Sequence, residues 1–339
     1  NRLTPCCSLI GMLLLLIPAF WIARQIGTPL SRLSAAATEI SQGKFDSELP
    51  KVAGNGEIAK LISSFDRMRV DLRRYITETT ETARAQEKLA SELNVAHSIQ
   101  AGMVPKNFDL LSGHGIDLFA MMTPAEEVGG DLYDFALLDN ETFYFCIGDV
   151  SGKGIPASLF MAVGKTLLKS TIQAIRNPAI ALKLVNKELM EYNEAALFIT
   201  AFCGLYNTRT GELVFAGAGH NPPILIDSQG QARFVEVKPA LPLAIVDQQS
   251  YENQYTRLET GEALFLYTDG ATDAIDAQGQ FFGSQRLFEE LNNSNSGSSS
   301  ELIHEKMAHI REFARGAIQS DDITMLLFQT GKESSQESH

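Results

Sequence analysis

Cysteine, tryptophan and basic residues are all scarce in this chain of 339 residues. It has four cysteines and one tryptophan, and its 41 aspartates and glutamates outnumber its 28 lysines and arginines, giving a net charge of -13. The cysteines form no C-x-x-C pair and no histidine cluster accompanies them, so neither a zinc site nor a disulfide framework is suggested, which suits a reduced, intracellular protein. Nucleic-acid binders carry basic patches, so the acidic balance argues against nucleic acid as a partner.

A nucleotide-binding P-loop is also missing, although the stretch GDVSGKG at 148–154 is rich in glycine. A P-loop needs G-x-x-x-x-G-K-[ST]. Here Ile147 stands where the first glycine should be, and Gly154 replaces the Ser or Thr that would reach magnesium. Asp149 still needs an explanation, because it follows an apolar, strand-like run and a buried carboxylate without a partner is costly. We therefore expect a cation beside it.

The N-terminal part contains an uncharged apolar run, CCSLIGMLLLLIPAFWIA, at 6–23. This length suits a bilayer core, and the helical pattern continues without the cleavage site of a signal peptide. The run predicts a transmembrane helix at 6–26. Basic residues follow from Arg24 onward, which predicts a protein of the inner (cytoplasmic) membrane with its catalytic domain in the cytoplasm. Because the chain lacks a starting Met, we also expect an upstream part such as an external sensor.

Two short amphipathic helices follow, joined by a connector at 43–55 that contains Gly and Pro. Their apolar residues recur at helical spacing: Leu30, Leu33, Ala37 and Ile40 in the first, and Ile58, Leu61, Phe65, Met68 and Leu72 in the second. Such helices bury little alone, so a parallel dimer that forms a four-helix bundle is expected. Pro29 and the triplet Gly56-Glu57-Ile58, which open the two helices, resemble a HAMP signalling module, placed at 27–76.

The segment 77–105 is polar and helix-prone. Its seam residues are spaced by four, three, four and three: Leu89, Leu93, Ala96, Gln100 and Met103. Ile76 lies thirteen residues before Leu89, one short of two heptads, so the seam shifts phase inside the segment. We predict a coiled-coil signalling linker that joins a homodimer through the HAMP and linker helices; the alternative is a solvated spacer helix.

From 106 to 330 the pattern is rich in β-strands. Apolar runs at 116–122, 131–138, 142–150, 199–207, 212–219, 222–227, 232–237, 262–270 and 323–329 predict strands, and helical stretches are predicted at 155–175, 178–193 and near 300–314. Strand runs with helix pairs inserted indicate an α+β layered domain rather than alternating βαβ units. The tail, 331–339, is disordered by composition.

Aspartates fall at the ends of several of these strands. The turn at 139–141 predicts a hairpin centred on Asn140, which places Asp131 and Asp149 nine residues to either side. Opposed residues of an antiparallel pair have Cβ atoms about 5 Å apart, so two carboxylates there repel unless a cation lies between them. Asp269 ends another strand, and the pair Asp321-Asp322 precedes the last. Carboxylate oxygens suit Mg²⁺ or Mn²⁺, and four ionised aspartates balance two divalent cations, as in two-metal phosphoryl transfer.

Five motifs resemble, in order, those of the bacterial metal-dependent Ser/Thr phosphatases of the type-2C superfamily, in the branch that includes sporulation and stress-response phosphatases. They are VGGDLYDF, GDVSGKGIPASLFMA, GAGHNPP, LYTDGATDA and DDITMLLF, and the resemblance covers 89–329. It implies an αββα sandwich with two Mn²⁺ or Mg²⁺ ions between the sheets. It also implies a phosphoserine or phosphothreonine substrate on a regulatory protein, such as an anti-sigma-factor antagonist of the STAS class.

The resemblance also assigns the metal ligands by position. Asp149 bridges both ions, the carbonyl of Val150 binds one, Asp269 and Asp321 bind the other, and Asp131 acts at the rim, partly through water. Asp321 is preferred over Asp322, although the sequence alone does not separate the two.

Four nearby residues are less clearly assigned. Ser151 stands where animal members have a histidine, which favours metal-bound water as the proton donor and leaves the acid unassigned. His220 is interpreted as a hydrogen-bonded turn histidine in preference to a catalytic one. Asp134 and Asp273 could support the ligands from behind, but we interpret them as surface charges.

Two features mimic other enzymes. Cys203 and Arg209 match the C-x₅-R spacing of cysteine-dependent phosphatases, but the cysteine lies inside a predicted strand and the arginine in a turn, so we expect a buried thiol and a surface arginine. His97 on the linker raises the alternative of a sensor histidine kinase. Ser98 follows it in place of an acidic residue, and no glycine-rich ATP lid appears later. A degenerate phosphatase-fold scaffold is the non-enzymatic alternative, and the intact aspartate set argues against it.

The phase shift in the linker generates a first prediction. A helix turns by about 100° per residue, so inserting one Ala after Arg84 should change basal phosphatase activity several-fold, since allosteric coupling is typically worth about 1–3 kcal/mol. Inserting seven residues restores the heptad phase and should return the activity towards the parent. Phosphate release from full-length membrane preparations measures both. Equal activity for insertions of zero, one, three and seven residues, in protein that still responds to its stimulus, would show a passive tether.

Overall fold

The computed structural model describes residues 17–18, 20–51, 56–191, 193–292 and 297–331. The chain divides into two compact units, Asn1–Ser91 and Glu92–His339. Most of the predicted transmembrane span at 6–26, and all of the predicted disordered tail except Gly331, lie outside the described residues. Within the described part, no helix combines the length and the apolar character needed to cross a bilayer.

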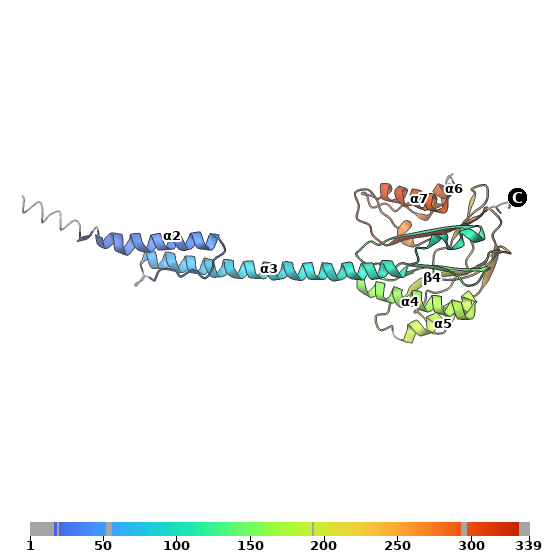
Figure 1. Ribbon diagram of the computed structural model, residues 1–339, viewed down its shortest axis with the longest axis horizontal. Coiled ribbons are helices and arrows are strands. Elements are labelled where there is room, and N and C mark those ends of the chain that lie inside the picture. Colours follow the sequence, from blue (N-terminus) through green and yellow to red (C-terminus); the bar gives the residue numbers. More distant parts are fainter. Residues whose placement is uncertain (1–16, 19, 52–55, 192, 293–296, 332–339) are drawn as a thin grey trace, which may run out of the picture. The chain divides into compact units, whose positions relative to one another are not determined.

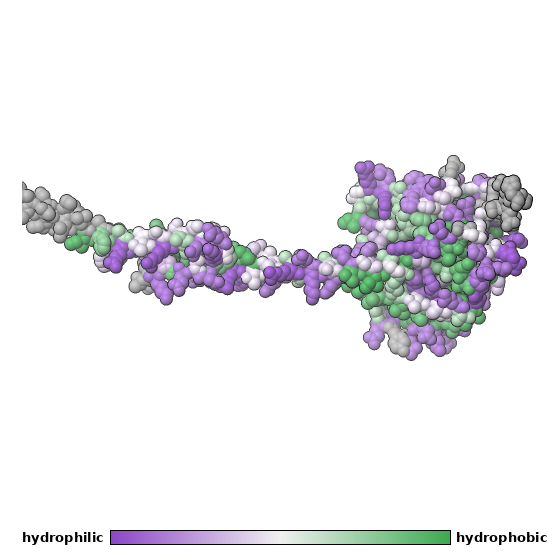
Figure 2. Space-filling model, viewed as in Figure 1, coloured by the Kyte–Doolittle hydropathy of each residue, from purple (hydrophilic) through white to green (hydrophobic). Residues whose placement is uncertain are grey.

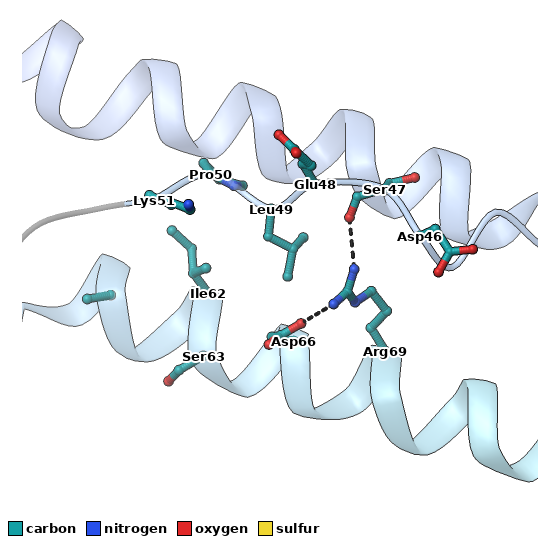
Figure 3. Close-up of a pocket in the computed structure, with 11 residues that line it drawn as sticks. Asp46, Ser47, Glu48, Leu49, Pro50, Lys51, Ile62, Ser63, Asp66 and Arg69 are labelled. Carbon is teal, nitrogen blue, oxygen red and sulfur yellow. Dashed lines mark hydrogen bonds and ion pairs between the residues drawn. The ribbon is translucent and has the colours of Figure 1, made fainter.

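The first unit is helical. A short π-helix, η1 (Ala23–Gly27), leads into α2 (Thr28–Ser41), which has Pro29 in its first turn and buries Leu33, Ala36 and Ile40. The connector then returns along α3 (Glu57–Met103), as Figure 1 shows. Arg69 of α3 fixes this connector because its guanidinium donates to the carbonyls of Phe45 (3.2 Å) and Ser47 (2.9 Å) and pairs with Asp66 (Figure 3).

Helix α3 continues without a break through the predicted linker. The structure therefore joins the second HAMP-like helix and the linker into one helix of 47 residues. Its side chains between 77 and 92 are exposed, and Figure 2 shows a mainly hydrophilic surface along this stretch. Beyond this stretch α3 contacts the second unit near its C-terminal end, where Gln100 bonds to Gly129.

Two antiparallel five-stranded sheets form the centre of the second unit. One has the strand order β1-β10-β9-β6-β7 and the other β2-β3-β4-β5-β8. The strands are β1 (Ile116–Thr123), β2 (Leu132–Leu137), β3 (Thr142–Val150), β4 (Ile199–Asn207), β5 (Glu212–Ala218), β6 (Ile224–Ile226), β7 (Ala232–Phe234), β8 (Gln254–Arg257), β9 (Ala263–Tyr267) and β10 (Ile323–Thr330).

Helices cover the outer face of each sheet, which makes four layers (Figure 1). Helices α4 (Gly154–Ile175) and α5 (Pro178–Glu191) pack on the sheet that contains β3, whereas α6 (Ser284–Asn292) and α7 (Ser299–Phe313) pack on the sheet that contains β10. Two short 3₁₀-helices, η2 (Phe108–His114) and η3 (Asp269–Ala271), complete the unit. The α+β class and the layered arrangement agree with the sequence prediction.

The alternation of side chains along β3 explains why its sequence is apolar throughout. Phe143 and Phe145 point into the core between the two sheets, where they meet Phe328 of β10. Tyr144 and Cys146 point the other way, into the core beneath α4 and α5. A strand buried on both faces needs apolar residues at every position.

Some elements were not predicted from the sequence. Strand β8 was missed because it lies at a sheet edge and alternates between half-buried and exposed residues, with no apolar run. Helix α6 and η2 were also missed. The predicted strand at 232–237 is shorter, since β7 ends at Phe234.

Asp134 corrects one prediction from the sequence. It is fully buried, so its interpretation as a surface charge is wrong. From β2 it reaches Lys165 and Lys169 of α4, each at 3.1 Å, and Lys165 is itself buried. The sequence concealed this ion pair because Lys165 lies 31 residues further along the chain and α4 is apolar around it.

This buried ion pair generates the second prediction. Replacing Lys165 with Met should lower the free energy of unfolding by about 3 kcal/mol, because it leaves Asp134 buried with only the partly exposed Lys169 as its partner. Urea denaturation measures the loss. Lys187→Met, an exposed lysine on α5, is the matched control and should change stability by less than about 0.5 kcal/mol. Equal effects of the two variants would contradict the assignment.

Candidate metal centre

Strand ends from both sheets bring the predicted aspartates towards one edge of the sandwich. Asp131 directly precedes β2, and Asp149 is the second-last residue of β3. The register pairs Leu132 with Gly148, so Asp131 stands at the next position along, facing Asp149. The predicted hairpin centred on Asn140 is therefore confirmed. From the other sheet, Asp269 begins η3 after β9, and Asp321 lies before β10.

Burial and neighbouring charges raise the pKa of three of these carboxyl groups. Burial raises the pKa of Asp149 to about 7, with further contributions from the charges of Asp269 and Asp321. The pKa of Asp131 is raised well above its usual value, first by burial and then by Asp149. The pKa of Asp269 is raised by burial and by Asp321. Because the charges of neighbouring aspartates act on one another, Asp131, Asp149, Asp269 and Asp321 form one negative cluster. A cation would relieve the repulsion within it.

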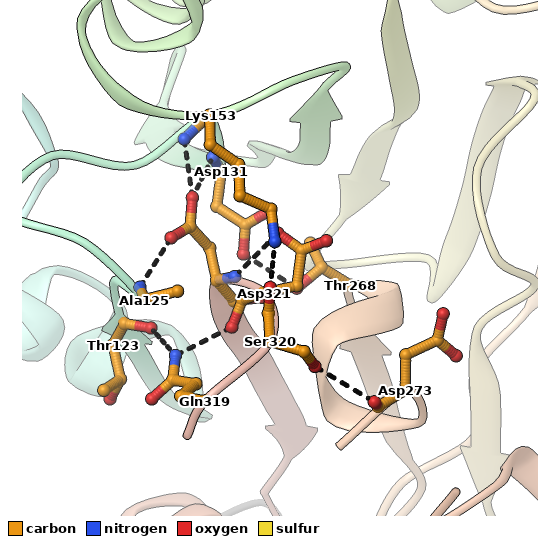
Figure 4. Close-up of polar contacts among 11 residues, drawn as sticks. Thr123, Ala125, Asp131, Lys153, Thr268, Asp273, Gln319, Ser320 and Asp321 are labelled. Carbon is orange, nitrogen blue, oxygen red and sulfur yellow. Dashed lines mark hydrogen bonds and ion pairs between the residues drawn. The ribbon is translucent and has the colours of Figure 1, made fainter. Parts of the chain in front are cut away.

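Several residues of the cluster also have polar partners within the protein (Figure 4). Thr268 donates to Oδ2 of Asp131 (2.8 Å). Lys153 lies 3.4 Å from Oδ1 of Asp321 and donates to the carbonyl of Ser320. Among the described residues, no three Asp, Glu, His or Cys side chains form a ready-made metal-binding group. The carboxylates of Asp131 and Asp321 thus each have a protein partner beside the cluster.

Asp321 and Asp322, which the sequence did not separate, have different surroundings. Asp322 is buried, and its carboxylate accepts hydrogen bonds from the backbone N–H groups of Ala125 (2.8 Å) and Gly130 (2.6 Å). Asp321 is partly exposed, with its charge acting on Asp149 and Asp269. Asp322 therefore holds the backbone of the preceding loop, and Asp321 faces the cluster.

The Gly-Gly pair before Asp131 is required by close packing. A Cβ on Gly129 would lie 2.4 Å from the Asp322 carboxylate, and one on Gly130 would lie 2.8 Å from the carbonyl oxygen of Val150. No side chain fits at either distance. The pair therefore lets the chain pass between Asp322 and Val150, which brings Asp131 to Asp149.

Ser151 and His220, to which the sequence assigned no role in proton transfer, each have a hydrogen-bond partner in the protein. The hydroxyl of Ser151 accepts from the N–H of Phe198 (2.9 Å). Nδ1 of His220 lies 2.9 Å from the hydroxyl of Thr200, which pairs with Asp149 across the sheet. Burial lowers the pKa of His220 to about 4, so this imidazole is neutral near pH 7. The hydrogen-bonded histidine expected from the sequence is confirmed.

The features that mimic other enzymes are resolved by the structure. Cys203 is buried within β4. Arg209 is exposed in the following turn and pairs with Glu141, so the expected buried thiol and surface arginine are confirmed. His97 bonds through Nδ1 to the carbonyl of Glu127 (2.7 Å). Asp273 is exposed, as expected.

Sequence reasoning missed three residues at this centre. Thr268 stands beside Asp269 in LYTDG, and Lys153 stands in GDVSGKG, where the failed P-loop spacing gives it no role. Gln100 was placed on a coiled-coil seam, yet it bonds to Gly129. For Gln100 the only signal was a polar residue at a seam position.

The two helix-covered sheets, with aspartates at the strand ends, define the class of PP2C-type protein serine/threonine phosphatases. Residues 139–331 match the family model described as Stage II sporulation protein E (SpoIIE), and residues 21–74 match the HAMP domain. The chain belongs to the SpoIIE family and carries an N-terminal HAMP region. The phosphatase resemblance is thereby confirmed, and the histidine kinase alternative is not supported.

Individual proteins show the same similarity. The chain is 30% identical to Protein IcfG of Synechocystis sp. over 94% of its own length but only 54% of that protein. It is 27% identical to the phosphoserine phosphatase RsbU of Bacillus subtilis, covering 72% of this chain and 71% of that one. In structure it resembles the SiaA-PP2C domain of Pseudomonas aeruginosa, with a TM-score of 0.64 and 25% identity over 73% of this chain and 99% of that one. The chain thus spans about half the length of IcfG.

The different surroundings of Asp321 and Asp322 generate the third prediction. Asp322→Ala should lower the free energy of unfolding by about 3 kcal/mol, because at least two backbone N–H groups lose a charged acceptor. Asp321→Ala removes a partly exposed carboxylate and should cost less than about 1 kcal/mol. Urea denaturation in EDTA compares the two. A larger loss in Asp321→Ala would reverse the roles assigned to the two aspartates.

Proposed function

We propose that this chain is a membrane-anchored, signal-regulated phosphatase that removes phosphate from phosphoserine or phosphothreonine on a regulatory protein. The observation that carries the proposal is the cluster of Asp131, Asp149, Asp269 and Asp321, contributed by both sheets and marked by raised pKa values at the first three. A divalent cation bound at this edge would offset the repulsion among the four like charges that the fold brings together.

The donor groups fit Mn²⁺ or Mg²⁺. They are carboxylate and carbonyl oxygens, the ligands that hard divalent cations prefer. In our proposal Asp149 would bridge two ions, Val150 would offer its carbonyl to one, and Asp269 and Asp321 would hold the other. Asp131 would act at the rim, partly through water. When bound, the ions would supply Lewis-acid stabilisation of the phosphoryl group.

The remaining residues would position these donors. Thr268 orients Asp131 through its hydroxyl, and Asp322 fixes the backbone from which Asp131 projects. The ammonium of Lys153 lies beside Asp321, where it offsets part of the negative charge. The Ser151 hydroxyl accepts a backbone N–H, and burial lowers the pKa of His220 to about 4, so its imidazole is neutral near pH 7. Neither residue is therefore assigned the task of protonating the leaving group.

The substrate and partner are proposed by similarity. The relative RsbU is named a phosphoserine phosphatase, and the sequence resemblance implies a STAS-type anti-sigma-factor antagonist as the phosphorylated partner. Phosphoserine on a small regulatory protein suits an open site, since the Asp321 side chain is 37% exposed.

Dimerisation and membrane attachment complete the proposal. In the first unit α3 exposes a row of large apolar side chains three, four and seven residues apart, namely Leu61, Met68, Leu72 and Tyr75. Such a row is the kind of surface a second copy covers in a parallel helical bundle. The apolar run at 6–23, followed by Arg24, supports attachment to the inner membrane with the catalytic domain in the cytoplasm.

The fourth prediction tests the metal assignment. Asp149→Asn should reduce manganese-dependent phosphate release from a serine-phosphorylated protein by several orders of magnitude, because it removes the charge shared by both ions. Folding should persist, since the substitution also removes charge repulsion. Circular dichroism and calorimetric titration with Mn²⁺ accompany the assay. The control is Asp247→Asn, which changes an exposed carboxylate on a loop. Near-normal turnover in Asp149→Asn would contradict the proposed metal site.

A further inference from the structure

Helix α3 buries a polar residue where it meets the second unit. The Gln100 side chain is only 5% exposed, whereas the apolar neighbours Val95 and Ile99 are 59% and 63% exposed. This reverses the usual arrangement, in which a helix buries its apolar face. A buried glutamine needs partners for both its N–H groups and its oxygen.

Gln100 finds those partners in the backbone of one residue. Its Nε2 donates to the carbonyl of Gly129 (2.6 Å), and its Oε1 accepts from the N–H of Gly129 (3.0 Å). The side-chain amide therefore satisfies both the N–H and the carbonyl of Gly129, as a neighbouring β-strand would. One turn earlier, Nδ1 of His97 meets the carbonyl of Glu127 (2.7 Å).

Residues 124–131 form a loop between β1 and β2, which we call the Asp131 loop. Gln100 and His97 hold it from the side of α3. Asp322 holds it through the N–H groups of Ala125, Gly130 and Asp131. The loop is thus fixed between the end of a helix and a buried carboxylate, and its last residue is Asp131.

We propose that Gln100 is a positioning residue of the metal centre, which sets the place of Asp131 by holding the backbone two residues before it. The inference rests on the proposed metal-dependent phosphatase function. It gives α3 a direct route to the site, because a shift of the helix end that breaks the amide pair releases the Asp131 loop. Gln100 acts through Asp131 and touches no substrate.

Gln100→Met in the full chain tests this role, because methionine keeps the volume and loses both hydrogen bonds. Ser98→Ala, an exposed residue on the same helix whose hydroxyl bonds only within α3, is the matched control. We expect faster hydrogen exchange of the amides at 125–131, about tenfold, with the rest of the second unit unchanged. The Mn²⁺ concentration for half-maximal activity should rise about tenfold, while kcat at saturating Mn²⁺ stays within about twofold of the parent.

The exchange measurement and calorimetric titration with Mn²⁺ do not depend on turnover. If the parent binds no Mn²⁺ and releases no phosphate, the proposed function fails, while local exchange at 125–131 still reports on the contact made by Gln100. Exchange and Mn²⁺ requirement equal to those of Ser98→Ala would overturn the inference. The inference would also be overturned if both Gln100→Met and Gln100→Glu, which keeps the side-chain oxygen as an acceptor, lost protection from hydrogen exchange throughout the second unit.

Discussion

Mutual repulsion among carboxylates is the constraint on which the rest of the second unit depends. Asp131, Asp149 and Asp269 have raised pKa values because the fold buries them and, in addition, holds acidic groups close together. Holding them there costs free energy, which the large aromatic core between the sheets must offset. The region of repulsion is small, and it lies where strands from the two sheets end, as is typical of functional sites.

The supporting contacts show how that repulsion is contained. Asp322 uses its charge to fix backbone N–H groups, and Asp134 uses its charge to hold α4 through Lys165. Two glycines allow backbone, carboxylate and carbonyl to approach more closely than any side chain would permit. The acidic residues of this region thus divide into those that face the cluster and those that bind the surrounding scaffold.

Much of this was predictable from the sequence, for reasons that the structure makes clear. The turn at 139–141 and the runs on either side were enough to set the register of β2 and β3, because side chains alternate along a strand and a hairpin fixes the pairing. The roles of Asp322, Asp134 and Gln100 were not predictable, because their partners lie at least 29 residues away in the chain. Strand β8 was hidden because its four residues, half-buried and exposed in turn, contain no apolar run.

The hairpin register between β2 and β3 also limits how the length of this turn can vary within the family. One residue added at 139–141 would move Asp131 out of step with Asp149 and would exchange the two faces of β2, turning Phe135 and Asp134 towards the wrong layers. Two residues added together would restore the faces but still displace Asp131 by about 7 Å along the strand. Length changes in relatives should therefore gather in other loops, and this turn should keep its size even where its residues differ.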